Sequence, residues 1–568
     1  MQQCRGFNLP PSRWSKNRGR YGRSHKSFWN RGRDLSACTA QAGDRSYNES
    51  FMIGNRAPVA KAMERFGIYV NRLRSGLPGD LLALIAGALT VLAFAPFNLY
   101  PLAMITPAAL FWLLNGVSVR RAWWRGFLFG LAEFACGVYW LYISIHVIAS
   151  APLWLTFLII AALVAFMAVY SALACALGVW LMPRAGRWRW IVVLPALWTL
   201  LEWLRGWLLT GFPWLSLGYS QIGGLLKGYA PVLGVYGVTL AVVLSAGLVL
   251  SALAPKAKLR SRLVSLSVLA AVWIAGGVLA SVSWTHPSGE PLRVSLMQGN
   301  IPSTIKWEPQ SFQPTLDLYR KMTEAHWDSR LIVWPESAVP DYADEVWDDF
   351  LEPLEKEARA HGTELLIGVP TENPATGAAY NSVISLGGHD GVYSKRHLVP
   401  LSEYFPLPTW ARRWLQSMNL PYSSFTPGAA NQPLLQAAGY AVGTSICYED
   451  AYGNEIMQAL PQAAFLVNVS DDGWFGDSIA LPQHFEIARM RALETGRYLL
   501  RDTNTGITAI VNNQGAVVKS LPRATRGVLQ GAVVPYAGGT PYQYIGNAAV
   551  VVGCLLLLLA AGWRRRQA

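Results

Sequence analysis

Three residues that lie far apart in the sequence have the side chains needed for acyl transfer through a thioester. Glu336, Lys395 and Cys447 each follow a short apolar run of the kind that forms a buried strand. These runs span residues 331–334, 383–386 and 442–446. A free thiol has a pKa of about 8.5, so at neutral pH a carboxylate must accept its proton and an ammonium must favour the thiolate. The same ammonium can stabilise the oxyanion that forms when sulfur attacks a carbonyl group.

Each of these residues also has an ordinary structural explanation. Cys447 is the only cysteine between residues 176 and 553, so it has no disulfide partner in this part of the chain. Cysteine is readily buried, and a structural thiol therefore stays open as an alternative. A glutamate or lysine at the end of a strand is usually a solvated side chain. It is the combination of base, cation and thiol that indicates a reaction.

The three runs belong to an α/β domain that we predict over residues 285–542. Short β-type runs alternate there with helical or loop segments, which is typical of a layered α/β domain. The predicted strands are residues 293–297, 331–334, 365–369, 383–386, 442–446, 465–469 and 507–511. Sites in such domains usually lie at the carboxyl ends of strands, which is where the sequence puts Glu336 and Cys447.

The rest of the chain is typical of a membrane protein. Of the 568 residues, 52% are hydrophobic, and eight apolar runs have roughly the length that crosses a bilayer. They lie near residues 79–97, 101–117, 124–145, 152–182, 190–209, 229–253, 264–284 and 543–563. We therefore predict a polytopic helical bundle of about eight helices, with a seven-helix domain over residues 63–284 and a last helix with a basic tail over residues 543–568.

The distribution of arginine and lysine predicts the orientation of this bundle. Basic residues follow the second, fourth and sixth runs and also close the chain at residues 564–566, and basic loops stay on the cytoplasmic side. Both termini are therefore expected in the cytoplasm, and residues 285–542 are expected in the periplasm. Residues 285–542 hold 18 Lys and Arg against 27 Asp and Glu, so the formal net charge of +14 does not indicate nucleic-acid binding.

Residues 1–62 are a separate basic extension. They hold 12 Lys and Arg against 3 Asp and Glu and show no hydrophobic periodicity, so we predict that they are disordered. Met63 begins a more conventional lead into the first helix. This favours a mis-assigned translation start as the origin of the extension.

The triad and its flanking sequences resemble the nitrilase superfamily, whose members use Glu, Lys and Cys in this order. Further similar motifs are Gln298-Gly299-Asn300-Ile301-Pro302, Lys306-Trp307, Tyr380-Asn381-Ser382, His397-Leu398-Val399-Pro400, Trp474-Phe475-Gly476 and the run from Ala488 to Glu494. Seven predicted helices before such a domain and one after it resemble the apolipoprotein N-acyltransferase family more narrowly. Leu204-Arg205-Gly206-Trp207 and Thr210-Gly211-Phe212-Pro213-Trp214 are similar to signatures of that family. The resemblance covers roughly residues 75–565.

This resemblance implies a fold and a set of roles. The fold would be an αββα sandwich, with Glu336 as general base, Lys395 as oxyanion stabiliser and Cys447 as nucleophile. Glu403 and Glu449 match acids that position the lysine and the incoming amine. Other positions that match accessory or substrate-binding residues are Trp307, Asn381, Tyr448, Trp474 and Phe475.

The implied reaction needs no metal and no organic cofactor. Its donor would be a phospholipid, with phosphatidylethanolamine expected, and its acceptor would be the N-terminal diacylglyceryl-cysteine of an apolipoprotein. The resemblance also implies a monomeric enzyme in the bacterial inner membrane.

Two local sequences depart from the family pattern. Before the residue that matches Glu403 the family usually has Phe-Gly, whereas this chain has Leu401-Ser402. Before the residue that matches Trp474 it usually has Asn-Asp-Ala, whereas this chain has Asp471-Asp472-Gly473. A backbone geometry that only glycine adopts easily would cost more at Ser402. The shapes of these two loops are therefore not predicted.

Three other functions stay open from the sequence. A membrane-tethered amidase or nitrilase would use the same triad on a small amide or nitrile. A transporter with an appended domain would usually show paired repeats and several polar groups in mid-membrane, which are scarce here. A purely structural membrane scaffold would not need Cys447 at all.

Overall fold

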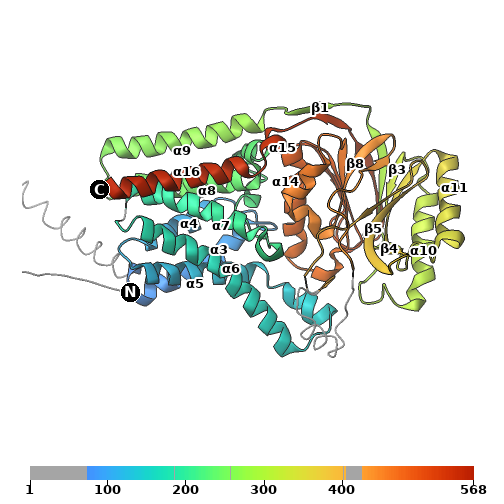
Figure 1. Ribbon diagram of the computed structural model, residues 1–568, viewed down its shortest axis with the longest axis horizontal. Coiled ribbons are helices and arrows are strands. Elements are labelled where there is room, and N and C mark those ends of the chain that lie inside the picture. The colour runs from blue at the N-terminus through green and yellow to red at the C-terminus, as the bar shows by residue number, and fades with distance from the viewer. Residues whose placement is uncertain (1–72, 185, 256, 401, 405–424, 568) are drawn as a thin grey trace, which may run out of the picture. The chain divides into compact units, whose positions relative to one another are not determined.

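The computed structural model describes residues 73–184, 186–255, 257–400, 402–404 and 425–567, and Figure 1 shows their arrangement. The basic extension predicted at residues 1–62 lies outside the described residues. In chain order, a set of apolar helices comes first, an α/β domain follows, and one more long helix ends the described chain.

Each of the eight predicted apolar runs overlaps a helix. These are α3 (Gly76–Thr90), α4 (Leu102–Leu113), α5 (Val119–Gly137), α6 (Leu153–Leu181), α7 (Leu194–Arg205), α8 (Ala230–Leu253), α9 (Leu259–Ala280) and α16 (Ala548–Gln567). In the described chain, five stretches are long and apolar enough to cross a membrane: Gly76–Ala93, Leu153–Leu181, Leu225–Leu253, Leu259–Ala280 and Ala548–Gln567. The protein is therefore a multi-pass membrane protein, whereas the number of eight crossings stays a prediction.

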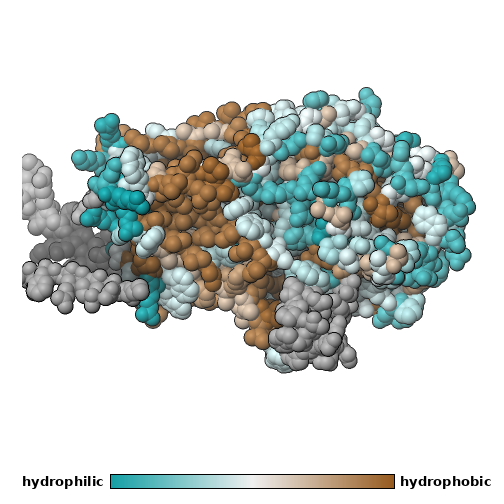
Figure 2. Space-filling model, in the orientation of Figure 1, coloured by the Kyte–Doolittle hydropathy of each residue, from teal (hydrophilic) through white to brown (hydrophobic). Residues whose placement is uncertain are grey.

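The surface of these helices is strongly apolar. Figure 2 shows a broad hydrophobic area over the helical part, flanked by hydrophilic surface on the α/β domain and at the other end of the helices. Large exposed apolar side chains on α9 and α16 include Ile274, Val278, Leu556 and Leu559. An apolar area of this extent marks contact with another apolar phase, which for a multi-pass protein is the lipid bilayer.

The α/β domain consists mainly of two six-stranded sheets. The first has the order β13 (Gly527–Val533), β2 (Leu292–Gln298), β3 (Leu331–Val333), β4 (Glu364–Asn373), β5 (Ala378–Leu386) and β6 (Gly391–Ser394). The second has the order β12 (Val517–Ser520), β11 (Ala509–Val511), β10 (Leu499–Thr503), β9 (Phe465–Ser470), β8 (Tyr440–Ile446) and β7 (Leu435–Ala437). Every strand predicted from the sequence lies in one of these sheets. The central strands are parallel in both sheets, so their carboxyl ends lie at the same edge.

The two sheets pack face to face and helices cover their outer faces. Leu296 and Val333 from the first sheet share one buried core with Ile446 and Val467 from the second. On the outside of the first sheet, α10 (Pro309–Glu324) and α11 (Glu352–His361) pack in a second core, while α14 (Ala480–Thr495) covers the second sheet. This αββα sandwich confirms the predicted fold class.

The sandwich is joined to the membrane helices through α14. The Glu494 carboxylate accepts a hydrogen bond of 2.7 Å from the backbone N–H of Val235 in α8. The indole N–H of Trp214, in the turn after α7, donates to Gln483 Oε1 at 2.8 Å. Both contacts are buried, so they fix the face of the sandwich that carries α14 against the helices.

Candidate functional site

The triad predicted from the sequence stands at the ends of strands. Glu336 lies three residues after β3, Lys395 directly follows β6, and Cys447 directly follows β8. Cys447 begins a short 3-10 helix, η8 (Cys447–Ala451), with a φ of 51°. This left-handed conformation is unusual for a residue with a side chain, and strained residues of this kind often cluster at active sites.

Lys395 is the centre of a buried hydrogen-bonded cluster. Its side chain is 1% exposed, and its Nζ donates to Glu403 Oε1 at 2.9 Å and to Glu336 Oε1 at 3.3 Å. The Asn381 amide donates to the same two oxygens, at 3.0 and 2.7 Å. The structure thus brings together four of the predicted site residues: Glu336, Lys395, Asn381 and Glu403.

The surroundings of Glu336 keep it ionised. Its second carboxylate oxygen accepts a hydrogen bond of 2.7 Å from the backbone N–H of Asp471. Burial by itself would raise the pKa of Glu336, but the Lys395 ammonium and these donors outweigh burial, and the pKa lies below its ordinary value. Burial likewise opposes the charge of Lys395, yet the two carboxylates raise its pKa well above the ordinary range.

Cys447 is held as a neutral thiol. Burial raises its pKa well above the ordinary value, and the negative charge of Glu336 raises it further. The Lys395 ammonium and a hydrogen bond from Ser470 act in the opposite direction. At neutral pH the site therefore holds a thiol, a carboxylate and an ammonium, so the thiol proton must move to a base when sulfur attacks.

Glu449 joins the segments that carry the cysteine and the lysine. Its carboxylate accepts hydrogen bonds from the backbone N–H of Ile446 (2.7 Å) and from the hydroxyl of Tyr393 (3.0 Å). It also accepts from the backbone N–H groups of Arg396 (2.6 Å) and His397 (3.2 Å). The side chain that the sequence predicts as an accessory acid thus fixes the position of Cys447 relative to Lys395.

Three predicted aromatic residues lie where the sandwich meets the membrane helices. The ring of Tyr448 stacks on Trp214 at 6.3 Å between centroids, and Phe475 packs edge-on against Trp140 at 4.8 Å. The carbonyl of Trp474 accepts a hydrogen bond of 2.6 Å from Ser144. The loops after β8 and β9 therefore face the helices.

Trp307 stands apart from this buried cluster. Its side chain is 54% exposed, whereas its neighbour Lys306 is 2% exposed and reaches the backbone of Glu336. A substrate-binding role for Trp307 stays a prediction.

The described residues of the two loops that depart from the family pattern, residues 402–404 and 471–473, contact other residues of the site. Glu403 keeps its contact with Lys395 although Ser402 precedes it. Asp471 forms an ion pair with Lys306 at 2.6 Å. A Cβ atom at Gly473 would lie 2.1 Å from Ser303 Oγ, so a larger residue here would require this serine side chain to move.

A buried charge network behind Cys447 was not predicted. His484 lies 3.0 Å from both Asp450 and Asp472, and Arg501 contacts the same two carboxylates at 2.8 and 3.1 Å. Burial would lower the pKa of His484, but the carboxylates outweigh it and raise the pKa to about 9. The network reaches the nucleophile through Asn468, which donates to the Cys447 carbonyl at 3.2 Å and accepts from Arg501 at 2.6 Å.

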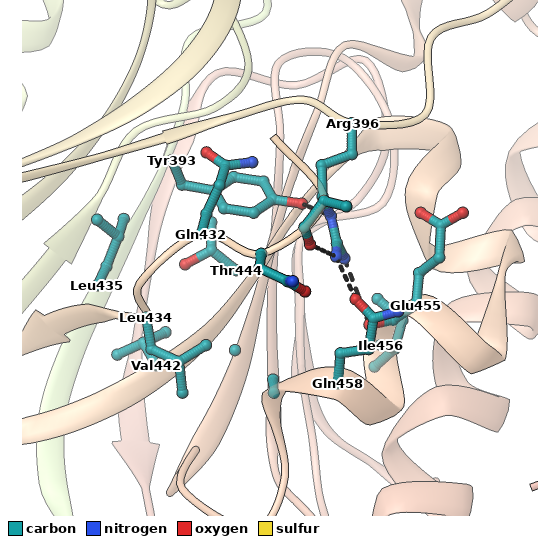
Figure 3. A pocket seen from close by; sticks show the side chains of 14 residues that line it. Tyr393, Arg396, Gln432, Leu434, Leu435, Val442, Thr444, Glu455, Ile456 and Gln458 are labelled. Atoms are coloured by element: carbon teal, nitrogen blue, oxygen red, sulfur yellow. Dashed lines mark hydrogen bonds between the residues drawn. The ribbon is translucent and has the colours of Figure 1, made fainter. Parts of the chain in front are cut away.

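A separate cavity of about 140 Å³ is lined by residues that include Tyr393, Arg396 and Gln458. Figure 3 shows Arg396 crossing this cavity to contact Tyr393 and Gln458. The hydroxyl of Thr444 also lines it. Across the described residues, no group of three His, Cys, Asp or Glu side chains is arranged to hold a metal ion.

Comparisons with known proteins match both parts of the chain. Residues 86–248 match the model of the apolipoprotein N-acyltransferase N-terminal domain, and residues 293–542 match the carbon-nitrogen hydrolase model. An apolipoprotein N-acyltransferase from Methylococcus capsulatus is 44% identical over 491 residues, covering 86% of this chain and 96% of the relative. One from Coxiella burnetii is 41% identical over 483 residues, covering 84% and 99%. A solved nitrilase-superfamily structure from Saccharomyces cerevisiae aligns with a TM-score of 0.33 at 17% identity, covering 44% of this chain and 93% of that one.

Proposed function

This chain belongs to the apolipoprotein N-acyltransferase family, and we propose that its acyltransferase reaction proceeds through a thioester on Cys447. The observation that carries the proposal is the buried contact between Lys395 and the ionised Glu336 at the strand ends that also deliver Cys447. The family activity is N-acylation of an apolipoprotein. We infer that the donor is a phospholipid, with phosphatidylethanolamine expected, and that the acceptor is the α-amino group of a diacylglyceryl-cysteine.

In the first half-reaction, Glu336 accepts the thiol proton while Cys447 Sγ attacks the ester carbonyl of the phospholipid. The Lys395 ammonium stabilises the negative charge that develops on the carbonyl oxygen. The ester C–O bond then breaks, and protonated Glu336 returns its proton to the leaving alkoxide. The products are a fatty-acyl thioester and a lysophospholipid.

In the second half-reaction, the α-amino group of the lipoprotein attacks the thioester carbonyl. Lys395 again stabilises the oxyanion, and Glu336 accepts a proton from the attacking amine. The C–S bond breaks, the new amide forms, and Glu336 gives its proton to the Cys447 thiolate. The site has then returned to its starting state, with no metal and no organic cofactor in any step.

We further infer that the sandwich lies on the periplasmic side of the bilayer. The C-terminal end of α16 lies at the end of the helices away from the sandwich (Figure 1). At this end of α16, Arg565 donates to the carbonyl of Trp180 at 3.0 Å and Arg564 lies 4.4 Å from the ring of Trp188. Basic ends of membrane helices stay in the cytoplasm. This supports cytoplasmic termini and a catalytic face at the outer leaflet.

The proposal can be tested with the purified full-length protein in detergent. We expect it to transfer a labelled acyl chain from phosphatidylethanolamine to the α-amino group of a diacylglyceryl-cysteine peptide, with lysophospholipid formed in equal amount. The same preparation is offered small amides and nitriles. Ammonia release from these compounds without peptide acylation would identify a membrane-tethered amidase or nitrilase instead.

A further inference from the structure

Lys306 is a buried cation next to Glu336, the proposed general base. The reaction proposed above gives Lys306 no role. Its side chain is 3% exposed, and its Nζ donates to the backbone carbonyl of Glu336 at 3.0 Å and to Asp471 Oδ2 at 2.6 Å. A lysine is rarely buried to this degree unless an opposite charge pairs with it. The position of this ammonium is therefore fixed by Glu336 and Asp471 together.

Asp471 has two opposite effects on Glu336: its backbone N–H stabilises the ionised carboxylate, and its own negative charge, if unpaired, would oppose that ionisation. Its backbone N–H donates to Glu336 Oε2 at 2.7 Å. The carboxylate of the same residue shares Lys306 with the backbone of Glu336. An unpaired negative charge in this place would make ionisation of Glu336 less favourable. The other contacts of this carboxylate are neutral donors, the amide of Asn504 (3.2 and 3.3 Å) and the N–H of Gly473 (3.2 Å).

The positive charge of Lys306 compensates the negative charge of Asp471. Within the described part of the chain, Lys306 is the ion-pair partner of Asp471, at 2.6 Å. Its positive charge also acts on Glu336 in the same direction as that of Lys395. The charged and titratable groups that face Glu336 are thus Lys395, Lys306, Asp471, Cys447 and, through Asn381, Glu403.

We propose that Lys306 is a positioning residue for the general base: it neutralises Asp471 and holds the backbone of Glu336, so that the Asp471 N–H orients an ionised Glu336 carboxylate. Lys306 does not touch the reacting atoms and acts through Glu336. The inference rests on the proposed function, because it assumes that Glu336 is the base.

The test measures kcat and KM of acyl transfer against pH for four full-length proteins: wild type, Lys306→Met, Asp471→Asn and the double variant. Lys306→Met leaves the Asp471 carboxylate unpaired beside Glu336. We expect the acidic limb of its kcat profile to move to higher pH by about one unit. At a pH below the acidic limbs of both wild type and Lys306→Met, this shift is roughly a tenfold loss of kcat. The sign follows because Glu336 must be ionised to accept a proton, and a raised pKa extends its protonated range upward.

The double variant decides whether charge is the cause. Asp471→Asn removes the uncompensated charge and keeps the backbone N–H, so we expect the limb of the double variant to return to within about threefold of wild type at each pH. Asp471→Asn alone is expected not to move the limb upward. Should Lys306→Met fail to fold in a melting assay, the double variant is compared with Asp471→Asn, and an acidic limb that moves upward in the double variant but not in Asp471→Asn overturns the proposal.

An unchanged limb in Lys306→Met overturns the proposal, and so does a double variant that stays as impaired as Lys306→Met. Failure of the underlying assumption looks different. If Glu336→Gln retains the wild-type rate, Glu336 is not the base and the proposed function fails, whatever the Lys306 variants do.

Discussion

Replacing Cys447 by alanine is expected to lower kcat for acyl transfer by roughly four orders of magnitude or more, because no thioester can form without the sulfur atom. The buried site changes little in shape, since alanine keeps the Cβ atom and Glu449 still holds the backbone around residue 447. The measurement is the steady-state rate of peptide acylation, together with the release of lysophospholipid in a single turnover.

The matched control for this variant is Cys136→Ala. Cys136 is an exposed cysteine in α5, an element that carries none of the triad. We expect the control to retain wild-type activity and melting temperature. Acylation at an appreciable rate by Cys447→Ala would show that the nucleophile is another group, and the thioester account would fall.

Replacing Glu336 by glutamine is expected to reduce the first half-reaction by about a thousandfold. The Cys447 thiol is protonated at neutral pH because burial and the Glu336 charge raise its pKa. Glutamine has the same shape but cannot accept the thiol proton, so sulfur attacks only as a rare thiolate. Lys395 still has Glu403 as a partner at 2.9 Å, which limits the structural damage.

The measurement for Glu336→Gln is the burst of lysophospholipid on mixing enzyme with phosphatidylethanolamine. The matched control is Glu403→Gln, which also removes one carboxylate from Lys395 but leaves the base in place. We expect the control to lose less activity than Glu336→Gln. If the two variants were equally impaired, the contacts of Lys395 with carboxylates, and not proton transfer to Glu336, would explain the loss.

Most of the fold could be predicted because it depends on local apolar patterns. The eight helices lie in mostly apolar stretches and β3 is wholly apolar, while β8 and β9 are apolar apart from a few small or polar residues such as Thr444 and Asn468. By contrast, β10 was missed because Arg501 and Asp502 interrupt its apolar pattern, although both are buried. Arg501 is tolerated there because Asp450 and Asp472 pair with it, and such pairs between distant segments leave no signal in a single sequence.

The site likewise has residues that could be predicted from the sequence and residues that could not. The triad members could be picked out because each follows a short apolar run, but their proximity depends on how the two sheets pack. Glu336 follows β3 of the first sheet, Lys395 follows the antiparallel strand β6, and Cys447 follows β8 of the second sheet. The roles of Lys306 and of Asp471 could not be predicted, since an ion pair across 165 positions depends on how two loops fold. The exposed position of Trp307 also follows from the loop and not from its residue type.

The most direct test of the central claim is intact-mass analysis with peptide mapping of the wild-type protein. The protein is incubated with phosphatidylethanolamine and then mixed with a diacylglyceryl-cysteine peptide. The account predicts one fatty-acyl group on Cys447 after the first step, and its loss from the protein as the peptide becomes N-acylated. An acyl group on another residue, or an adduct on Cys447 that persists while acylated peptide accumulates, would contradict it.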